Sequence, residues 1–63
     1  MKYIVKWYDN EGYQTKEFND LWDADNWAAN RSAKFGWARL NGNPERWYYR
    51  EYKNGVQVKV EIN

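Results

Sequence analysis

The dipeptide Asn54-Gly55 constrains the fold of this 63-residue chain more than any other feature of its sequence. Asn-Gly is strongly favoured in two-residue hairpin turns of type I′, in which both residues need positive φ. The flanking segments 46–53 and 56–62 are rich in aromatic and β-branched residues, so we predict that they form two antiparallel strands. Such a turn sets Lys53 opposite Val56, and every later pair follows by counting outward.

This counting predicts which side chains share a face of the sheet. The apolar members of the last strand should be buried, because aliphatic residues are scarce in this chain; they are Val56, Val58, Val60 and Ile62. The count adds Trp47 and Tyr49 to that buried side. The other side should face solvent, because a single helix covers only one face of a sheet. On that side the count places Arg46, Tyr48, Arg50 and Tyr52, beside Gln57, Lys59 and Glu61.

Two interpretations of the solvent-facing row stay open. Arg and Tyr are enriched among residues that dominate binding energy, which favours a contact surface. Alternatively, the row is an ordinary solvated strand face with pairs such as Tyr48 opposite Glu61. We favour the contact surface, because the count places Arg50 opposite Lys59, and a purely structural face would avoid such like charges.

The rest of the chain indicates three more strands and one helix. Alternation predicts strands over 2–8 and 13–18, joined by a turn at 9–12 in which Gly12 is left-handed; the register of this hairpin stays open. A short strand over 37–40 ends in a turn at 41–44. Asn19 or Asp20 caps a helix that runs to about residue 34 and ends at Gly36. The order β-β-α-β-β-β predicts a single α+β domain over 1–63, an antiparallel sheet with one helix packed on one face.

The helix carries two apolar stripes. The first should pack on the sheet; it consists of Leu21, Ala24, Ala28 and Phe35, with Trp27 at its margin. The second consists of Trp22, Ala29 and Ala33. It is either the flank of one wide buried face or a surface for self-association, so the chain is expected to be a monomer or a homodimer.

Composition argues against most kinds of chemistry. The chain has no His and no Cys, so it lacks the commonest general base, the commonest metal ligand and any thiolate. The carboxylates Asp20, Asp23 and Asp25 suit helix capping better than acid–base work or a metal loop. We therefore predict a non-enzymatic protein with no catalytic residues, no metal site and no cofactor. No apolar run approaches the length of a membrane span, and no signal peptide follows Met1, so we expect a cytoplasmic protein without membrane contact.

The aromatic content of 21% has a structural and a functional interpretation. Large rings build a core in a chain with few aliphatic residues, but Trp and Tyr are too numerous here for all of them to be covered by one helix. The basic residues concentrate in the strands and the acidic ones in the turns and the helix. The net charge of +1 therefore conceals a molecule with a positive sheet and a negative helix side.

Two resemblances to known families bear on function. The segment KYIVKWYDNEGYQTKEF, followed by LWDADNWAA, resembles the amino-terminal arm-binding domain of phage integrases. That likeness implies a sheet laid in the DNA major groove, with roles for Lys6, Lys16 and Tyr8. The layout is also similar to small phage-encoded host-takeover and anti-defence proteins, which include antitoxins that inhibit a host RNase toxin by protein contact. The similarity rests on Lys6-Trp7, on Thr15-Lys16-Glu17 and on Asn26-Trp27-Ala28.

These observations predict a binding protein that sequesters or inhibits a macromolecule, and the second resemblance implies a phage protein acting on a host defence protein. Its expected contact residues are Arg46, Tyr48, Arg50, Tyr52 and Lys59. The alternative is a small DNA- or RNA-binding protein that uses the same face, with Lys6, Lys16 and Tyr8 added.

Overall fold

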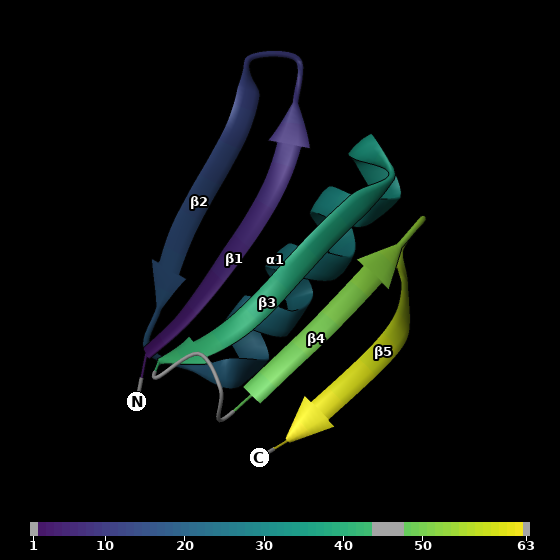
Figure 1. Ribbon diagram of the computed structural model, residues 1–63. Helices are drawn as coiled ribbons and strands as arrows, with labels where there is room; N and C mark the ends of the chain where they lie inside the picture. The colour runs from purple at the N-terminus through teal and green to yellow at the C-terminus, as the bar shows by residue number, and fades with distance from the viewer. Residues whose placement is uncertain (1, 44–47, 63) are drawn as a thin grey trace.

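A computed structural model describes residues 2–43 and 48–62 of the chain. Five strands and one helix follow one another as β1 (Lys2–Asp9), β2 (Gly12–Phe18), α1 (Leu21–Phe35), β3 (Trp37–Asn43), β4 (Tyr48–Lys53) and β5 (Val56–Ile62). The strands form one antiparallel sheet in the order β2-β1-β3-β4-β5, and α1 crosses one face of it (Figure 1). The predicted α+β architecture and element order are confirmed.

Both hairpin turns have the left-handed residues that the sequence predicts. Asn54 and Gly55 have φ of 53° and 86°, and Lys53 lies opposite Val56. In the first hairpin Gly12 has φ 107° and pairs with Asp9, which settles the register that the sequence left open. The Asp9 carboxylate accepts the backbone N–H of Glu11 at 2.8 Å inside this turn. This hydrogen bond lowers the pKa of Asp9, because it stabilises the ionised carboxylate.

The helix begins and ends with the predicted caps. The Asp20 side chain accepts the backbone N–H of Asp23 at 3.1 Å, and Gly36 is left-handed with φ 101°. Ala24 and Ala28 are fully buried against the sheet. Because alanines occupy this stripe, large side chains from the strands can fill the space below the helix. The buried hydrophobic residues of the described strands are Val5, Trp7, Ala38, Leu40, Tyr48 and Tyr52.

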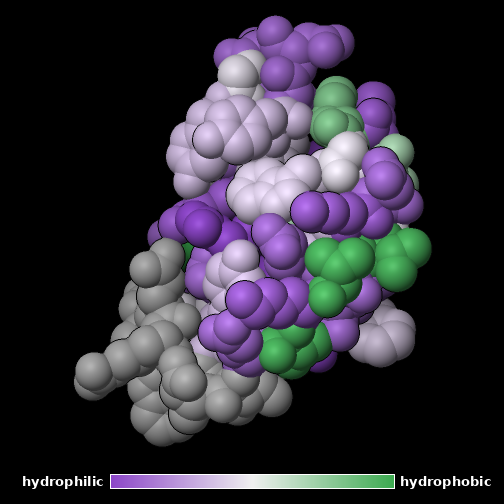
Figure 2. All heavy atoms as spheres, turned by 45° about the vertical axis from the view of Figure 1, so that its right-hand side comes forward, coloured by the Kyte–Doolittle hydropathy of each residue, from purple (hydrophilic) through white to green (hydrophobic). Residues whose placement is uncertain are grey.

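The predicted orientation of β4 and β5 was wrong. Tyr48 and Tyr52 lie beneath α1 with 9% and 2% of their surface exposed, whereas Val56, Val58 and Val60 are 63%, 52% and 41% exposed. A helix is about 10 Å wide and strands are about 4.8 Å apart, so one helix covers only two or three strands. Here α1 lies over the inner strands, and β5 is the outermost strand on one side (Figure 1). Figure 2 shows its side of the molecule, where hydrophobic side chains alternate with hydrophilic ones.

Asp25 on α1 explains how the polar side chains of Arg50 and Tyr52 on β4 are accommodated under the helix. The Arg50 guanidinium donates to Asp25 Oδ1 at 2.9 Å, and the Tyr52 hydroxyl donates to the same oxygen. Burial and the neighbouring Asp25 carboxylate raise the pKa of Tyr52 well above its ordinary value. The guanidinium of Arg50 and the hydroxyl of Tyr52 thus share a charged acceptor, while the methylene groups of Arg50 and the ring of Tyr52 lie below the helix.

A β-bulge changes the register of the second hairpin. Tyr52 pairs with Gln57, but Glu51 pairs with Lys59, which leaves Val58 as the extra residue of β5. Beyond the bulge, Arg50 lies opposite Val60, not Lys59, so the like-charge pair expected from the sequence does not form. The predicted pair of Tyr48 with Glu61 is also replaced, because Tyr49 occupies that place.

The third strand is longer than predicted. It runs to Asn43, so residues 41–43, which the sequence assigned to a turn, continue the ladder with β1 as far as Lys2. Asn41 lies between Ile4 and Tyr49 and is 4% exposed. The predicted contact residue Arg46 and the predicted core residue Trp47 lie outside the described residues.

Candidate functional site: the open face of the sheet

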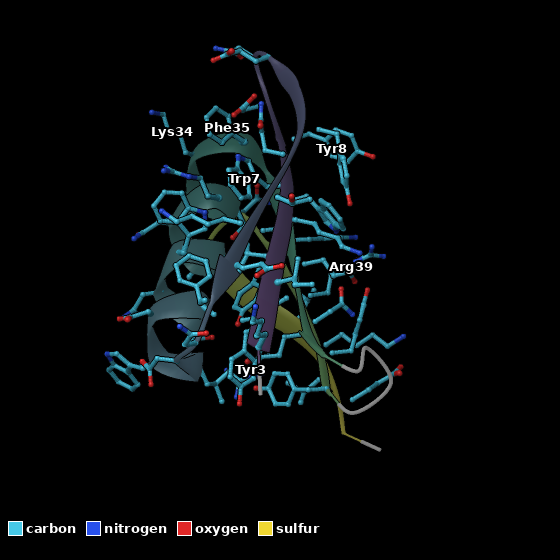
Figure 3. All side chains as sticks on the ribbon, turned by 90° about the vertical axis from the view of Figure 1, so that its left-hand side faces the viewer. Tyr3, Trp7, Tyr8, Lys34, Phe35 and Arg39 are labelled. Carbon is cyan, nitrogen blue, oxygen red and sulfur yellow. The ribbon has the colours of Figure 1, made fainter. Side chains whose placement is uncertain are left out.

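The side of the sheet away from α1 is termed the open face. Among the side chains that the structure describes, alternation along each strand and the register between strands place on it Lys2, Ile4, Lys6, Tyr8, Tyr13, Thr15, Glu17, Trp37, Arg39, Asn41, Tyr49, Glu51, Lys53, Val56, Lys59 and Glu61. Figure 3 shows Tyr8 and Arg39 projecting from the sheet away from the helix, while Trp7 and Phe35 lie on the helix side.

Three rings from three strands form a continuous aromatic cluster on the open face. Tyr8 on β1 lies directly opposite Tyr13 on β2, and their ring centroids are 5.2 Å apart. The Tyr8 ring also lies 5.9 Å from the Trp37 ring on β3, at an interplanar angle of 41°. These separations are typical of favourable ring contacts. Yet Tyr8 and Tyr13 remain 58% and 51% exposed, so the cluster presents a large apolar area to solvent.

Cations and a fourth ring extend this cluster toward the opposite edge of the sheet. The Arg39 guanidinium lies 6.0 Å from the Trp37 ring centroid and 5.9 Å from that of Tyr49. The ammonium group of Lys59 on β5 lies 6.0 Å from the Tyr49 centroid. Distances near 6 Å are at the outer limit of cation–π attraction, so these cations are held only weakly by the rings. We term the resulting series, Tyr13, Tyr8, Trp37, Arg39, Tyr49 and Lys59, the aromatic–cation row.

Hydrogen bonds fix parts of the row. The Trp37 indole N–H donates to Glu51 Oε2 at 2.9 Å, which orients the ring across the β3–β4 pair. Lys59 forms an ion pair of 3.0 Å with Glu61, and that contact raises the pKa of Lys59. Both residues are about half exposed, so solvent screens this pair and it contributes little to stability. The Trp37 ring is therefore held by a hydrogen bond, whereas the Lys59 side chain is held only weakly.

The open face is less basic than the sequence predicted. Among the described residues, its basic side chains are Lys2, Lys6, Arg39, Lys53 and Lys59, and its acidic side chains are Glu17, Glu51 and Glu61. Two strand cations that the sequence counted for the sheet lie instead on the helix side. One is Arg50, which pairs with Asp25; the other is Lys16, whose ammonium group lies 4.2 Å from the Trp27 ring centroid. The result is a face of mixed charge.

The structure brings together only some of the predicted contact residues. Lys6, Tyr8 and Lys59 lie on the open face, as expected. The assignment of Tyr48, Arg50 and Tyr52 to that face was wrong, because they lie under α1. Lys16 is a surface residue on the helix side, next to Trp27, and is separated from Lys6 by the sheet itself.

The second apolar stripe of α1 is divided between two environments. Ala29 packs against the core, and a Cβ placed on Gly55 would lie 3.1 Å from the Ala33 Cβ. These two alanines therefore flank the buried face and make room for the β4–β5 turn. Trp22 is 73% exposed and lies apart from them at the start of the helix.

Sequence reasoning missed most of the aromatic–cation row. Trp37, Arg39 and Tyr49 were not among the expected contact residues, although the alternation of Trp37-Ala38-Arg39-Leu40 carries the signal. Ala38 and Leu40 are buried, so Trp37 and Arg39 must face the other way. Tyr13 could be assigned only once the register of the first hairpin was known.

The described residues contain no group of three or more carboxylate side chains placed to hold a metal ion. Within the same residues, α1 is too short and too polar to cross a bilayer. No protein-family model, curated protein or solved structure matches this chain.

Proposed function

We propose that this chain is a non-enzymatic binding protein that captures a macromolecular partner on the open face of its sheet. The observation that carries the proposal is the contact of Tyr8 with both Tyr13 and Trp37, in a cluster in which Tyr8 and Tyr13 stay about half exposed. Ordered aromatic residues lose little conformational entropy on binding, and Tyr, Trp and Arg are the residues that most often dominate binding energy.

A protein partner fits this face better than a nucleic acid. Glu17, Glu51 and Glu61 are spread over three strands of the open face, and they would repel a phosphate backbone that tracked across it. The net charge of +1 gives no long-range attraction to compensate. Mixed charges around an aromatic centre are instead typical of a protein interface, in which a polar rim surrounds an apolar core.

The resemblance to phage anti-defence proteins extends this proposal to a bacterial host protein as the inhibited partner. Inhibition by contact requires only that the open face cover the partner's working surface. The alternative partner is single-stranded nucleic acid, and the exposed rings of Tyr8 and Tyr13 favour it, because bases stack on such rings.

The test is capture from a bacterial lysate, followed by a binding measurement with the purified partner. Replacing Tyr8 and Tyr13 by Ala should weaken binding at least tenfold, because the pair forms the exposed part of the cluster. Trp22→Ala is the matched control: it removes an even more exposed ring, 73% exposed, from the helix side and should leave binding unchanged. Circular dichroism confirms that each variant is folded.

The same experiment separates the two classes of partner. A protein complex should survive nuclease treatment and weaken only modestly with salt. Binding of a fluorescent single-stranded oligonucleotide should fall linearly on a log–log scale with salt if phosphate contacts dominate. A folded Tyr8→Ala/Tyr13→Ala variant that binds its partner like the wild type would contradict the proposed role of the open face.

A further inference from the structure

The two outer edges of the sheet differ in character. Along β2, the exposed residues between the turn and Phe18 are mainly polar, and Glu17 pairs with Lys2 at 3.5 Å. Along β5, three valines are between 41% and 63% exposed, and α1 does not extend over them. An outer strand offers unpaired backbone N–H and C=O groups, and proteins usually protect such an edge with charge. The β5 edge therefore combines exposed valines with the charged residues Lys59 and Glu61.

The bulge at Val58 limits where a further strand could pair with β5. On its turn side, only the pairs Lys53–Val56 and Tyr52–Gln57 separate the bulge from the turn. Beyond it, Lys59, Val60 and Glu61 continue in regular register opposite Glu51, Arg50 and Tyr49. The part of the β5 edge suited to regular pairing is therefore the stretch beyond the bulge, centred on Val60.

The charges of this half are self-complementary in one arrangement. If two copies of β5 pair antiparallel about a two-fold axis at Val60, Lys59 of each copy lies opposite Glu61 of the other. An axis at Lys59 or at Glu61 would instead place like charges opposite each other. Lys59 and Glu61 lie on the same face and are 3.0 Å apart within one chain, so both can exchange partners with a second copy without moving far.

We propose that two copies of this chain associate through their β5 edges, antiparallel and centred on Val60. The dimer forms one continuous sheet, and its interface joins the exposed valine of each copy to that of the other, flanked by two Lys59–Glu61 pairs. This inference goes beyond the proposed function and does not depend on it.

The arrangement has a consequence for the open face. The two-fold axis of an antiparallel pair is perpendicular to the sheet, so both helices lie on one side and both open faces on the other. Lys59 is the last residue of the aromatic–cation row, at 6.0 Å from the Tyr49 ring centroid. The dimer thus places two such rows end to end, in one surface of twofold symmetry.

Sedimentation velocity and native mass spectrometry of the full chain test the proposal. Because a short strand pair buries less area than a standard interface, the measurement extends to about 1 mM protein. The wild type should shift with concentration from 7.7 kDa to twice that mass. Lys59→Glu and Glu61→Lys should each weaken self-association at least tenfold, because each places like charges across the interface. An equimolar mixture of the two variants should recover the dimer as a mixed species.

The mixture is decisive because the two substitutions can restore the dimer only if residues 59 and 61 of different chains lie opposite each other. If a substitution instead prevented dimerisation by changing its own chain, mixing would not restore the dimer. Glu17→Lys is the matched control: it reverses one charge of a comparable ion pair on the opposite edge and should leave dimerisation unchanged. Thermal melts establish that all variants are folded. A wild type that stays at 7.7 kDa throughout, or single variants that dimerise normally, or a mixture that fails to recover the dimer, would each overturn the proposal.

Discussion

The backbone N–H of Gly55 donates a hydrogen bond of 2.8 Å to the Ser32 hydroxyl, which joins the β4–β5 turn to the last part of α1. The same hydroxyl donates to the Ala29 carbonyl at 3.0 Å, so its donor and one of its acceptor positions are both used. The next backbone N–H toward β4, that of Asn54, donates to the Gly36 carbonyl at 3.2 Å. A helix end and a hairpin turn that are distant in sequence are thereby fixed to each other.

Ser32→Ala should therefore destabilise the protein, although Ala has a higher helix propensity than Ser. Ser32 is fully buried, so the Gly55 N–H would lose its partner in a place with little access to water. An unsatisfied buried group costs about 1–3 kcal/mol, which exceeds the gain in helix propensity of roughly 0.5 kcal/mol. Urea unfolding at neutral pH measures the difference. An Ala variant as stable as the wild type would mean that the turn does not depend on this bond.

Gly55→Ala and Gly12→Ala together separate backbone strain from packing. Both glycines have positive φ, 86° and 107°, so an added Cβ strains each backbone by about 1–2 kcal/mol. At Gly12 no atom lies within 4 Å of the added Cβ, whereas at Gly55 the Ala33 Cβ lies 3.1 Å away. We expect the Gly55 variant to lose more unfolding free energy than the Gly12 variant. If both variants lose the same unfolding free energy, the contact between the added Cβ at Gly55 and Ala33 costs nothing, because the turn can move away from the helix.

Tyr52→Phe should change the response to alkaline pH. The folded protein holds the pKa of Tyr52 above 10.0, because its hydroxyl is buried and bound to Asp25. The contribution of this group to stability is fully present below pH 10 and is lost as the pH rises toward the folded-state pKa, because only the unfolded chain ionises in that interval. The wild type should therefore lose stability above about pH 10, and the Phe variant should lose less.

Urea unfolding between about pH 8 and pH 11.5 tests this expectation. At the low end, Tyr52→Phe should be about 1–2 kcal/mol less stable than the wild type, because it lacks the hydrogen bond to a carboxylate. Tyr13→Phe is the control, since Tyr13 is half exposed on the open face and the variant retains Tyr52. If the difference in unfolding free energy between the wild type and Tyr52→Phe stays constant over this range, folding does not raise the pKa of Tyr52.

Asp9→Asn should alter the response to acid. The Glu11 N–H holds the pKa of Asp9 below 3.8, so its stabilising contribution is present above that pH and is lost as the pH falls through the folded-state value. Asn retains an acceptor oxygen for the turn but does not titrate. The variant should therefore show a shallower loss of unfolding free energy on acidification, measured by thermal melts between about pH 2 and pH 6. Parallel pH profiles for the two proteins would contradict this role.

The sequence predicted the elements of this fold better than the faces of its sheet. Local signals were sufficient for the caps at Asp20 and Gly36 and for the type I′ turn at Asn54-Gly55, because a few neighbouring residues determine such features. The choice between the tyrosine and the valine side of the last hairpin was not local. It depended on how far the helix extends over the sheet and on the presence of Asp25 above Tyr52.

The bulge shows a second limit of prediction by counting. A two-residue turn determined the pairs of Lys53 and Tyr52, but one extra residue at Val58 displaced every pair beyond it. Nothing in the alternation of valines with polar residues indicates that residue as the extra one. The open face could still have been predicted in part from Trp37-Ala38-Arg39-Leu40, since the small and aliphatic members must be the buried ones.

The unequal anchoring of the two hairpin turns determines where the chain can be lengthened. The turn at Asn54-Gly55 is tied to Ser32 of α1 and to Gly36, which caps that helix, so an inserted peptide there would detach the last hairpin from the helix. The turn at Asn10-Glu11 extends beyond the helix (Figure 1), and a side chain added at Gly12 would meet no neighbour. Affinity tags, fluorophores and spin labels therefore belong in the first turn, where they leave the architecture of the rest of the molecule intact.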